Sequence, residues 1–183
     1  MSELIITIAI LVVAAIWIYN LLVKDRNRVL AAWSDIDVQL KRRYELIPQL
    51  VTTVKAYADF EKTTMTAITE LRARSKAESH LPQKSALETQ IGSAIGQLII
   101  VAEDYPELNA DSNFRQLQKD LTEIEDHVQY ARRFYNGSVR IFNTRVESFP
   151  NFIVARLFGF EIAEYFEVDH ADERKSSIIE LNE

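Results

Sequence analysis

LIITIAILVVAAIWIYNLLV, residues 4–23, is a run of twenty residues without a charged side chain. As a helix, a run of this length rises ~30 Å, which matches the hydrocarbon core of a bilayer. A buried core helix is the alternative, but so long an uncharged run at the start of the chain argues against it. A cleaved signal peptide is also disfavoured, because no Lys or Arg precedes the run and no small-x-small cleavage site follows it. The sequence therefore predicts a transmembrane helix over residues 4–23, behind a short segment of residues 1–3.

The C-terminal flank of this helix has the residue types of a membrane interface. Aromatic rings with a polar group prefer the headgroup level, and basic residues are enriched on the cytoplasmic side of a membrane. The other flank carries only Glu3. We therefore expect the N-terminus to lie outside and the main domain in the cytoplasm. The predicted interface residues are Trp17, Tyr19, Lys24, Arg26 and Arg28.

The composition favours an all-helical fold. Only four of the 183 residues are Gly and four are Pro, too few for the many turns that short strands need. Cysteine is absent, which excludes disulfides, thiol catalysis and cysteine-based metal sites. The net charge of −6 comes from the acidic end of the chain after residue 160. No broad basic face remains, so we expect no binding to nucleic acid.

Beyond the anchor, apolar residues recur every three or four positions in three long stretches, the signature of buried helical faces. The first stretch runs from about residue 29 to residue 71, the second over about residues 83–103, and the third ends near residue 146. No residue between Val23 and Val29 breaks a helix, so the anchor and the first bundle helix are expected to form one rod. A bend is expected near Ile47 and Pro48, because proline removes one helix hydrogen bond, and a full break at this point is the alternative.

The third stretch has the clearest pattern in the chain. Gly137 is its one weak point and costs about 1 kcal/mol relative to Ala. Asp111 or Ser112 is expected to cap its N-terminus. The apolar residues step by three and four along one face: Leu117, Leu121, Ile124, Val128, Ala131, Tyr135, Val139, Phe142 and Val146.

These patterns together predict an all-α fold in which a transmembrane helix continues into an antiparallel bundle of three long helices. A short C-terminal helix, FIVARLFGF (residues 152–160), follows Pro150. The bundle is expected over residues 24–166 and a flexible acidic tail over residues 167–183. If the second helix reverses the chain, the third runs parallel to the first. The Phe-rich segment that follows it, residues 149–166, then lies far from the bilayer.

Three groups of residues are candidates for contacts within the bundle or between subunits: a basic cluster, the pair Arg132 and Arg133, and the Phe-rich segment. The basic cluster Lys41, Arg42 and Arg43 either forms a solvated face paired with acids such as Asp35, Asp37 and Glu45, or meets an acidic surface of another subunit. The Phe-rich segment either closes the bundle end or is an exposed patch for oligomer or membrane contact. The candidates are Lys41, Arg42, Arg43, Arg132, Arg133, Phe152, Phe158 and Phe160.

No pattern points to catalysis or to a cofactor. Glu123 and His127 share a helix face and could ligate a metal, but a helical metal site needs ligands from a second helix, and no matching pair occurs. The favoured interpretation is a solvated polar face. Neither a nucleophile elbow nor a phosphate loop is present. We expect no catalytic residues, no metal and no cofactor.

Three segments in this order resemble the LemA family of bacterial membrane proteins: residues 19–61, residues 103–143 and residues 149–160. The most specific run is QLKRR-x-x-LIP-x-LV-x-TVK-x-YA, residues 39–58. The resemblance implies an antiparallel helical bundle on an N-terminal membrane anchor, without an established activity. Some relatives carry a lipoprotein signal instead, a variant that needs a cysteine. One magnetosome member is tied to membrane shaping, and family genes often neighbour a membrane zinc metalloprotease.

The expected function is that of a non-enzymatic scaffold, anchored in the bacterial inner membrane by residues 4–23. It is expected to form a homo-oligomer and to organise or remodel the membrane. The alternative is an adaptor or regulator of a membrane partner, such as a quality-control protease or a signalling protein.

Overall fold

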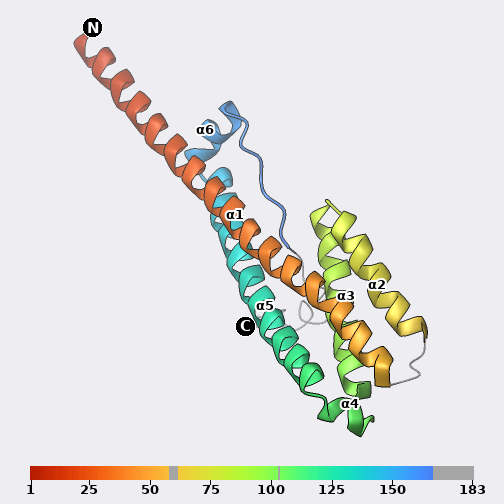
Figure 1. The fold of residues 1–183 in the computed structure, drawn as a ribbon. Helices are drawn as coiled ribbons and strands as arrows, with labels where there is room; N and C mark the ends of the chain where they lie inside the picture. Colours follow the sequence, from red (N-terminus) through yellow and green to blue (C-terminus); the bar gives the residue numbers. More distant parts are fainter. Residues whose placement is uncertain (58–61, 103, 167–183) are drawn as a thin grey trace, which may run out of the picture. The chain divides into compact units, whose positions relative to one another are not determined.

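A computed structural model describes residues 1–57, 62–102 and 104–166, and within these ranges every regular element is a helix (Figure 1). The predicted all-α class is therefore confirmed. The acidic tail predicted over residues 167–183 lies outside the described residues. The elements are α1 (Ser2–Tyr57), α2 (Lys62–Ala77), α3 (Leu81–Ala102), α4 (Pro106–Ala110), α5 (Ser112–Glu147) and α6 (Asn151–Leu157).

The chain forms two compact units. Unit 1 comprises residues 1–45 and 120–165, and unit 2 comprises residues 46–119 with Phe166. The helices α1 and α5 each contribute to both units. The structure thus divides the predicted bundle of residues 24–166 between the two units.

The helix α1 joins the anchor to the folded domain without interruption. It continues through Pro48, so a full break at that position does not occur. Its buried residues step by three and four and define the α1 seam. The seam comprises Ile18, Leu22, Asp25, Val29, Ala32, Ile36, Leu40, Arg43, Ile47, Leu50 and Val54.

The first predicted stretch, residues 29–71, contains two helices rather than one. α1 ends at Tyr57 and α2 begins at Lys62. The residues between them, Ala58 to Glu61, include neither Pro nor Gly, so no helix-breaking residue marks the boundary. The described residues therefore contain four long helices, α1, α2, α3 and α5, where three were predicted.

The extra helix changes the direction of α5. In unit 1, Asp25 of α1 pairs with Arg145 of α5, and Arg43 pairs with Glu125. Positions therefore rise along α1 while they fall along α5, so the two helices are antiparallel. The expectation of a parallel pair was wrong, because it counted one helix too few. The end of α5 consequently lies beside the anchor end of α1 (Figure 1).

The local predictions for α5 are confirmed. All nine residues of its predicted face, from Leu117 to Val146, are buried. The helix is capped by Asp111, whose Oδ1 accepts hydrogen bonds from the backbone N–H of Asn113 at 2.7 Å and of Phe114 at 3.1 Å. These bonds satisfy two of the amide groups that a helix N-terminus leaves without a partner.

The Gly137→Ala variant should stabilise the protein by about 1 kcal/mol. Gly137 lies inside α5, and a Cβ atom built there meets no atom within 4 Å. The methyl group therefore adds helix propensity without a clash. Chemical denaturation of the detergent-purified protein measures the effect. A midpoint below that of the unmodified protein would show that a neighbouring group fills the space.

Unit 2 contains an antiparallel pair formed by α2 and α3. Its core holds polar groups besides apolar ones. Ser75 donates a short hydrogen bond to Glu88, and the Lys84 Nζ donates to the carbonyl oxygen of Ser75 at 3.1 Å. All three side chains are buried. These contacts connect the end of α2 with the first turns of α3.

Candidate membrane-proximal site

The short helix α6 ends in a motif that turns the chain back on itself. Gly159 has a φ of +67°, a left-handed conformation that suits glycine. The backbone N–H of Phe160 donates to the carbonyl oxygen of Ala155 at 2.9 Å, and that of Gly159 donates to Arg156 at 3.5 Å. This pair of bonds is a Schellman motif, which ends α6 and directs the following residues away from it.

Aromatic contacts join the end of α6 to the anchor. The ring of Tyr19 lies 4.8 Å from that of Phe158 and 5.7 Å from that of Phe160, both edge to face. The Arg26 guanidinium lies over the Phe160 ring at 5.2 Å, a cation–π contact. Leu22, within the predicted transmembrane segment, is 0% exposed. The last turns of the predicted anchor are therefore covered by protein on one side.

The segment after α6 is fastened to α5 through its backbone. The Asn143 amide donates to the carbonyl oxygen of Ala163 at 2.9 Å and accepts from its N–H at 2.8 Å. The Tyr135 hydroxyl donates to the carbonyl oxygen of Glu164 at 2.9 Å. Burial, and to a lesser degree the negative charge of Glu164, raise the pKa of Tyr135 above its usual value. The phenol thus keeps the proton that this bond requires.

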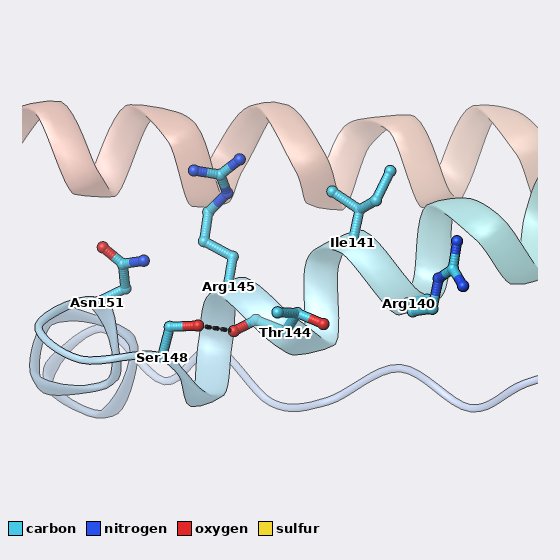
Figure 2. A pocket seen from close by; sticks show the side chains of 6 residues that line it. All are labelled: Arg140, Ile141, Thr144, Arg145, Ser148 and Asn151. Atoms are coloured by element: carbon cyan, nitrogen blue, oxygen red, sulfur yellow. Dashed lines mark hydrogen bonds between the residues drawn. The ribbon is translucent and has the colours of Figure 1, made fainter.

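An ion pair links α1 and α5 just beyond the anchor. The Nε of Arg145 lies 2.5 Å from the Oδ2 of Asp25, and Asp25 is only 7% exposed. The side chain of Arg145 extends from α5 toward α1 (Figure 2). Neither residue was among those predicted from the sequence. Asp25 occupies an apolar-spaced position in the α1 seam, between Leu22 and Val29, and this placement was the available signal. Arg145 lies outside the predicted apolar face of α5, so its sequence position gave no such signal.

The predicted interface residues gather at this end of unit 1. Trp17, Lys24, Arg26 and Arg28 are exposed, and so is much of Tyr19. The guanidinium of Arg28 lies over the ring of Phe134 at 5.4 Å. Of the predicted contact residues, Phe152 and Phe158 are exposed and Phe160 is buried. The structure therefore brings the Phe-rich segment to the anchor, although the sequence analysis placed it far from the bilayer.

The basic cluster does not form one face. Lys41 is exposed and pairs with Asp37 at 2.6 Å, and Arg42 is also exposed. Arg43 is 1% exposed and its NH1 lies 2.6 Å from the Oε2 of Glu125. For Arg43 the alternative of a solvated face therefore does not apply, and its contact with Glu125 lies within unit 1. Arg43 follows Ile36 by seven residues, so it occupies a seam position and pairs across to α5.

The two predicted arginines of α5 also differ in their exposure to solvent. Arg132 is buried and Arg133 is exposed. Farther along α5, His127 Nε2 lies 3.7 Å from Glu123 Oε1, and both side chains are exposed. Among residues 1–57, 62–102 and 104–166, no group of three or more His, Cys, Asp or Glu side chains could hold a metal ion.

Two open depressions lie on unit 1. The first, about 360 Å³, is lined by residues of α5 and α6 and of the turn between them (Figure 2). Its guanidinium, hydroxyl and amide donors suit an anionic group, but Arg145 is already paired with Asp25, so we assign it no ligand. Its lining residues are Arg140, Ile141, Thr144, Arg145, Ser148 and Asn151. The second, about 230 Å³, is lined by Asp35, Val38, Gln39, His127, Tyr130, Ala131 and Phe134.

One helix in the described part of the chain, α1, is long and apolar enough to cross a membrane, and its apolar N-terminal part is almost entirely exposed. The described residues thus define the class of all-helical membrane proteins, with α1 as the one helix among them that is able to serve as an N-terminal anchor. The sequence pattern of the LemA family matches residues 32–180. The chain belongs to the LemA family.

The following named relatives are 24–28% identical to this chain. Protein LemA of Metamycoplasma hominis is 28% identical over 157 residues, which cover 84% of this chain and 72% of that protein. Magnetosome protein MamQ 2 of Paramagnetospirillum magneticum is 25% identical over 175 residues. Magnetosome protein MamQ of Magnetospirillum gryphiswaldense is 24% identical over 174 residues. In both cases the match covers 81% of this chain but only 64% of the relative.

Proposed function

We propose that this protein is a non-enzymatic scaffold of the bacterial inner membrane, which self-associates and thereby organises or remodels the membrane. The observation that carries the proposal is an exposed apolar surface on unit 1, attached through the uninterrupted helix α1 to the membrane anchor. We name this surface the lateral stripe. It consists of Val38 from α1 and Tyr130, Phe134 and Ile141 from α5, all exposed.

The lateral stripe has the spacing of a helix–helix contact. Tyr130, Phe134, Gly137 and Ile141 step by four, three and four residues, so they share one face of α5. Val38, Tyr130 and Phe134 line the depression of about 230 Å³, which can receive a side chain. A heptad-like row of apolar residues beside a depression is the geometry in which helices pack knobs into holes.

A second copy of the same chain is the favoured occupant. The anchor of every copy enters the bilayer in the same direction, so the lateral stripes of neighbouring copies stand at the same height. Confinement to one plane also raises their effective concentration, so that a modest contact suffices for association. The names of the relatives specify no activity, so the proposal rests on this geometry.

The proposed location of the folded part is the cytoplasm. Lys24, Arg26 and Arg28 are exposed immediately after the anchor, whereas Glu3 is the only charged side chain before it. An excess of basic residues marks the cytoplasmic side. The N-terminus is accordingly proposed to lie outside.

The Tyr130→Lys/Phe134→Lys variant should dissociate the oligomer. If two large aromatic side chains are buried in the contact, their loss and the added charges weaken self-association about 100-fold. Single-molecule photobleaching of the labelled full-length protein in vesicles counts the subunits at several protein-to-lipid ratios. The matched control is Gln129→Lys, which adds a charge at an exposed position about 100° around α5.

Tyr130→Cys extends the same experiment to cells, because the chain has no other cysteine. Bismaleimide cross-linking should give mainly self-adducts, and an impermeant maleimide should not label intact spheroplasts. Monomers at all ratios would contradict the scaffold. Monomers combined with one recurrent heterologous adduct would favour the adaptor alternative instead.

A further inference from the structure

We propose that α6 makes a second membrane contact, lying in the interface of the leaflet from which α1 emerges. The surface concerned is the outward side of α6 together with the residue before Pro150. We name it the α6 apolar face. Its residues, all exposed, are Phe149, Phe152, Ile153, Leu157 and Phe158.

The height of α6 follows from its contacts with the anchor. Tyr19 precedes the end of the predicted transmembrane segment, Val23, by four residues, or about 6 Å along a helix. The Tyr19 ring contacts Phe158 at 4.8 Å. Ile18 and Leu22, on the same side of α1, are buried. If residues 4–23 span the bilayer, α6 therefore lies level with their last turns, at the depth of the headgroups and the upper acyl chains.

The helix α6 has one side buried in the protein and one exposed apolar side, as a helix that lies in the membrane interface requires. Val154 and Ala155 are buried within unit 1, whereas the α6 apolar face points outward. Phe149 is 79% exposed and Leu157 is 77% exposed, which is costly in water for large apolar side chains that are close in sequence. Arg156 is the only charged residue between positions 149 and 160. An exposed basic side chain beside apolar ones suits an anionic lipid surface.

A lipid surface fits this face better than a second copy does. The α6 apolar face adjoins the anchor, whose exposed residues the bilayer must cover in any case. It is also distinct from the lateral stripe, since the two share no residue. The inference depends on the membrane anchor and not on self-association, so the failure of one leaves the other open to test.

Cysteine substitutions in the otherwise cysteine-free full chain measure the depth of the face directly. Ile153→Cys, Leu157→Cys and Phe149→Cys are labelled with an environment-sensitive fluorophore, one at a time. The protein is placed in nanodiscs that hold a single copy, with and without lipids carrying a quencher near the headgroup. Trp17→Cys is the reference inside the membrane, and Tyr130→Cys is the reference for an exposed aromatic position away from it. All of these positions are exposed, and circular dichroism checks that each variant folds.

The expected result is a blue-shifted emission at positions 153 and 157, quenched by the shallow quencher as strongly as at position 17. Position 130 should remain red-shifted and unquenched. Emission at positions 149, 153 and 157 equal to that at position 130 would overturn the proposal. A blue shift that occurs only in discs with several copies would also overturn it, because a second copy would then be covering the face.

Discussion

Replacement of Arg145 by methionine should lower the free energy of unfolding by about 3 kcal/mol. The reason is an asymmetry between the two partners of the ion pair. Asp25 is almost completely buried, and the Arg145 guanidinium lies 2.5 Å from it. Without Arg145 the buried carboxylate loses its counter-charge, and the desolvation of that carboxylate is no longer offset. The partial exposure of Arg145 keeps the expected value at the lower end for buried pairs.

Denaturation of the detergent-purified protein measures this loss. The double variant Asp25→Leu/Arg145→Met should recover most of the stability, because neither charge is then buried alone. Arg140→Met, at an exposed arginine of the same helix, should change the stability by less than about 0.5 kcal/mol. If Arg145→Met and Arg140→Met behave alike, the ion pair contributes nothing to the fold.

Replacement of Asn143 by leucine should detach residues 160–165 from α5. The variant loses both hydrogen bonds to Ala163 and leaves that backbone N–H and C=O without these partners. Two such bonds to a buried side chain are worth about 2–3 kcal/mol together. Since Tyr135 holds only one carbonyl of the same segment, it does not compensate.

Hydrogen exchange followed by mass spectrometry detects this detachment in peptides that cover residues 158–166. The N–H of Ala163 should exchange about 100-fold faster, because 2.7 kcal/mol of local stability corresponds to that factor. Asn143→Asp, which keeps the acceptor but loses the donor, should have an intermediate effect. Thr144→Leu, at the exposed neighbouring position, is the control. Unchanged protection in Asn143→Leu would show that the apolar contacts of Phe160 alone hold the segment.

Local patterns allowed much of the fold to be predicted. The apolar period identified nine buried residues of α5 between Leu117 and Val146, and the helix start was predicted at Asp111 or Ser112, of which Asp111 is the cap. Both features depend on neighbours three or four residues apart, which the sequence displays directly. The break between α1 and α2 has no Pro or Gly to mark it, so one helix was missed and the direction of α5 was inverted.

The candidate site shows the same division between local and distant information. Trp17, Tyr19 and the basic residues after the anchor were predicted as interface residues from their residue types and position alone. The contact of Tyr19 with Phe158 joins residues that are far apart in the sequence. Its prediction required the correct number of helices, because each turn between helices reverses the direction of the chain. Asp25 and Arg43 could have been recognised as buried, because each occupies a seam position of α1. Their partners on α5 could not, since pairing across helices leaves no local trace.

The Asp25–Arg145 pair can form only late in the synthesis of the chain. The partners are 120 residues apart, so the anchor leaves the ribosome long before α5 exists. At about 5–20 residues per second, synthesis of the chain between Asp25 and Arg145 takes roughly 6–24 s. During that time the nascent chain is held at the membrane with Leu22, Ile36 and Leu40 uncovered by α5. The helix α6, synthesised later still, then packs against the end of unit 1 that was translated first.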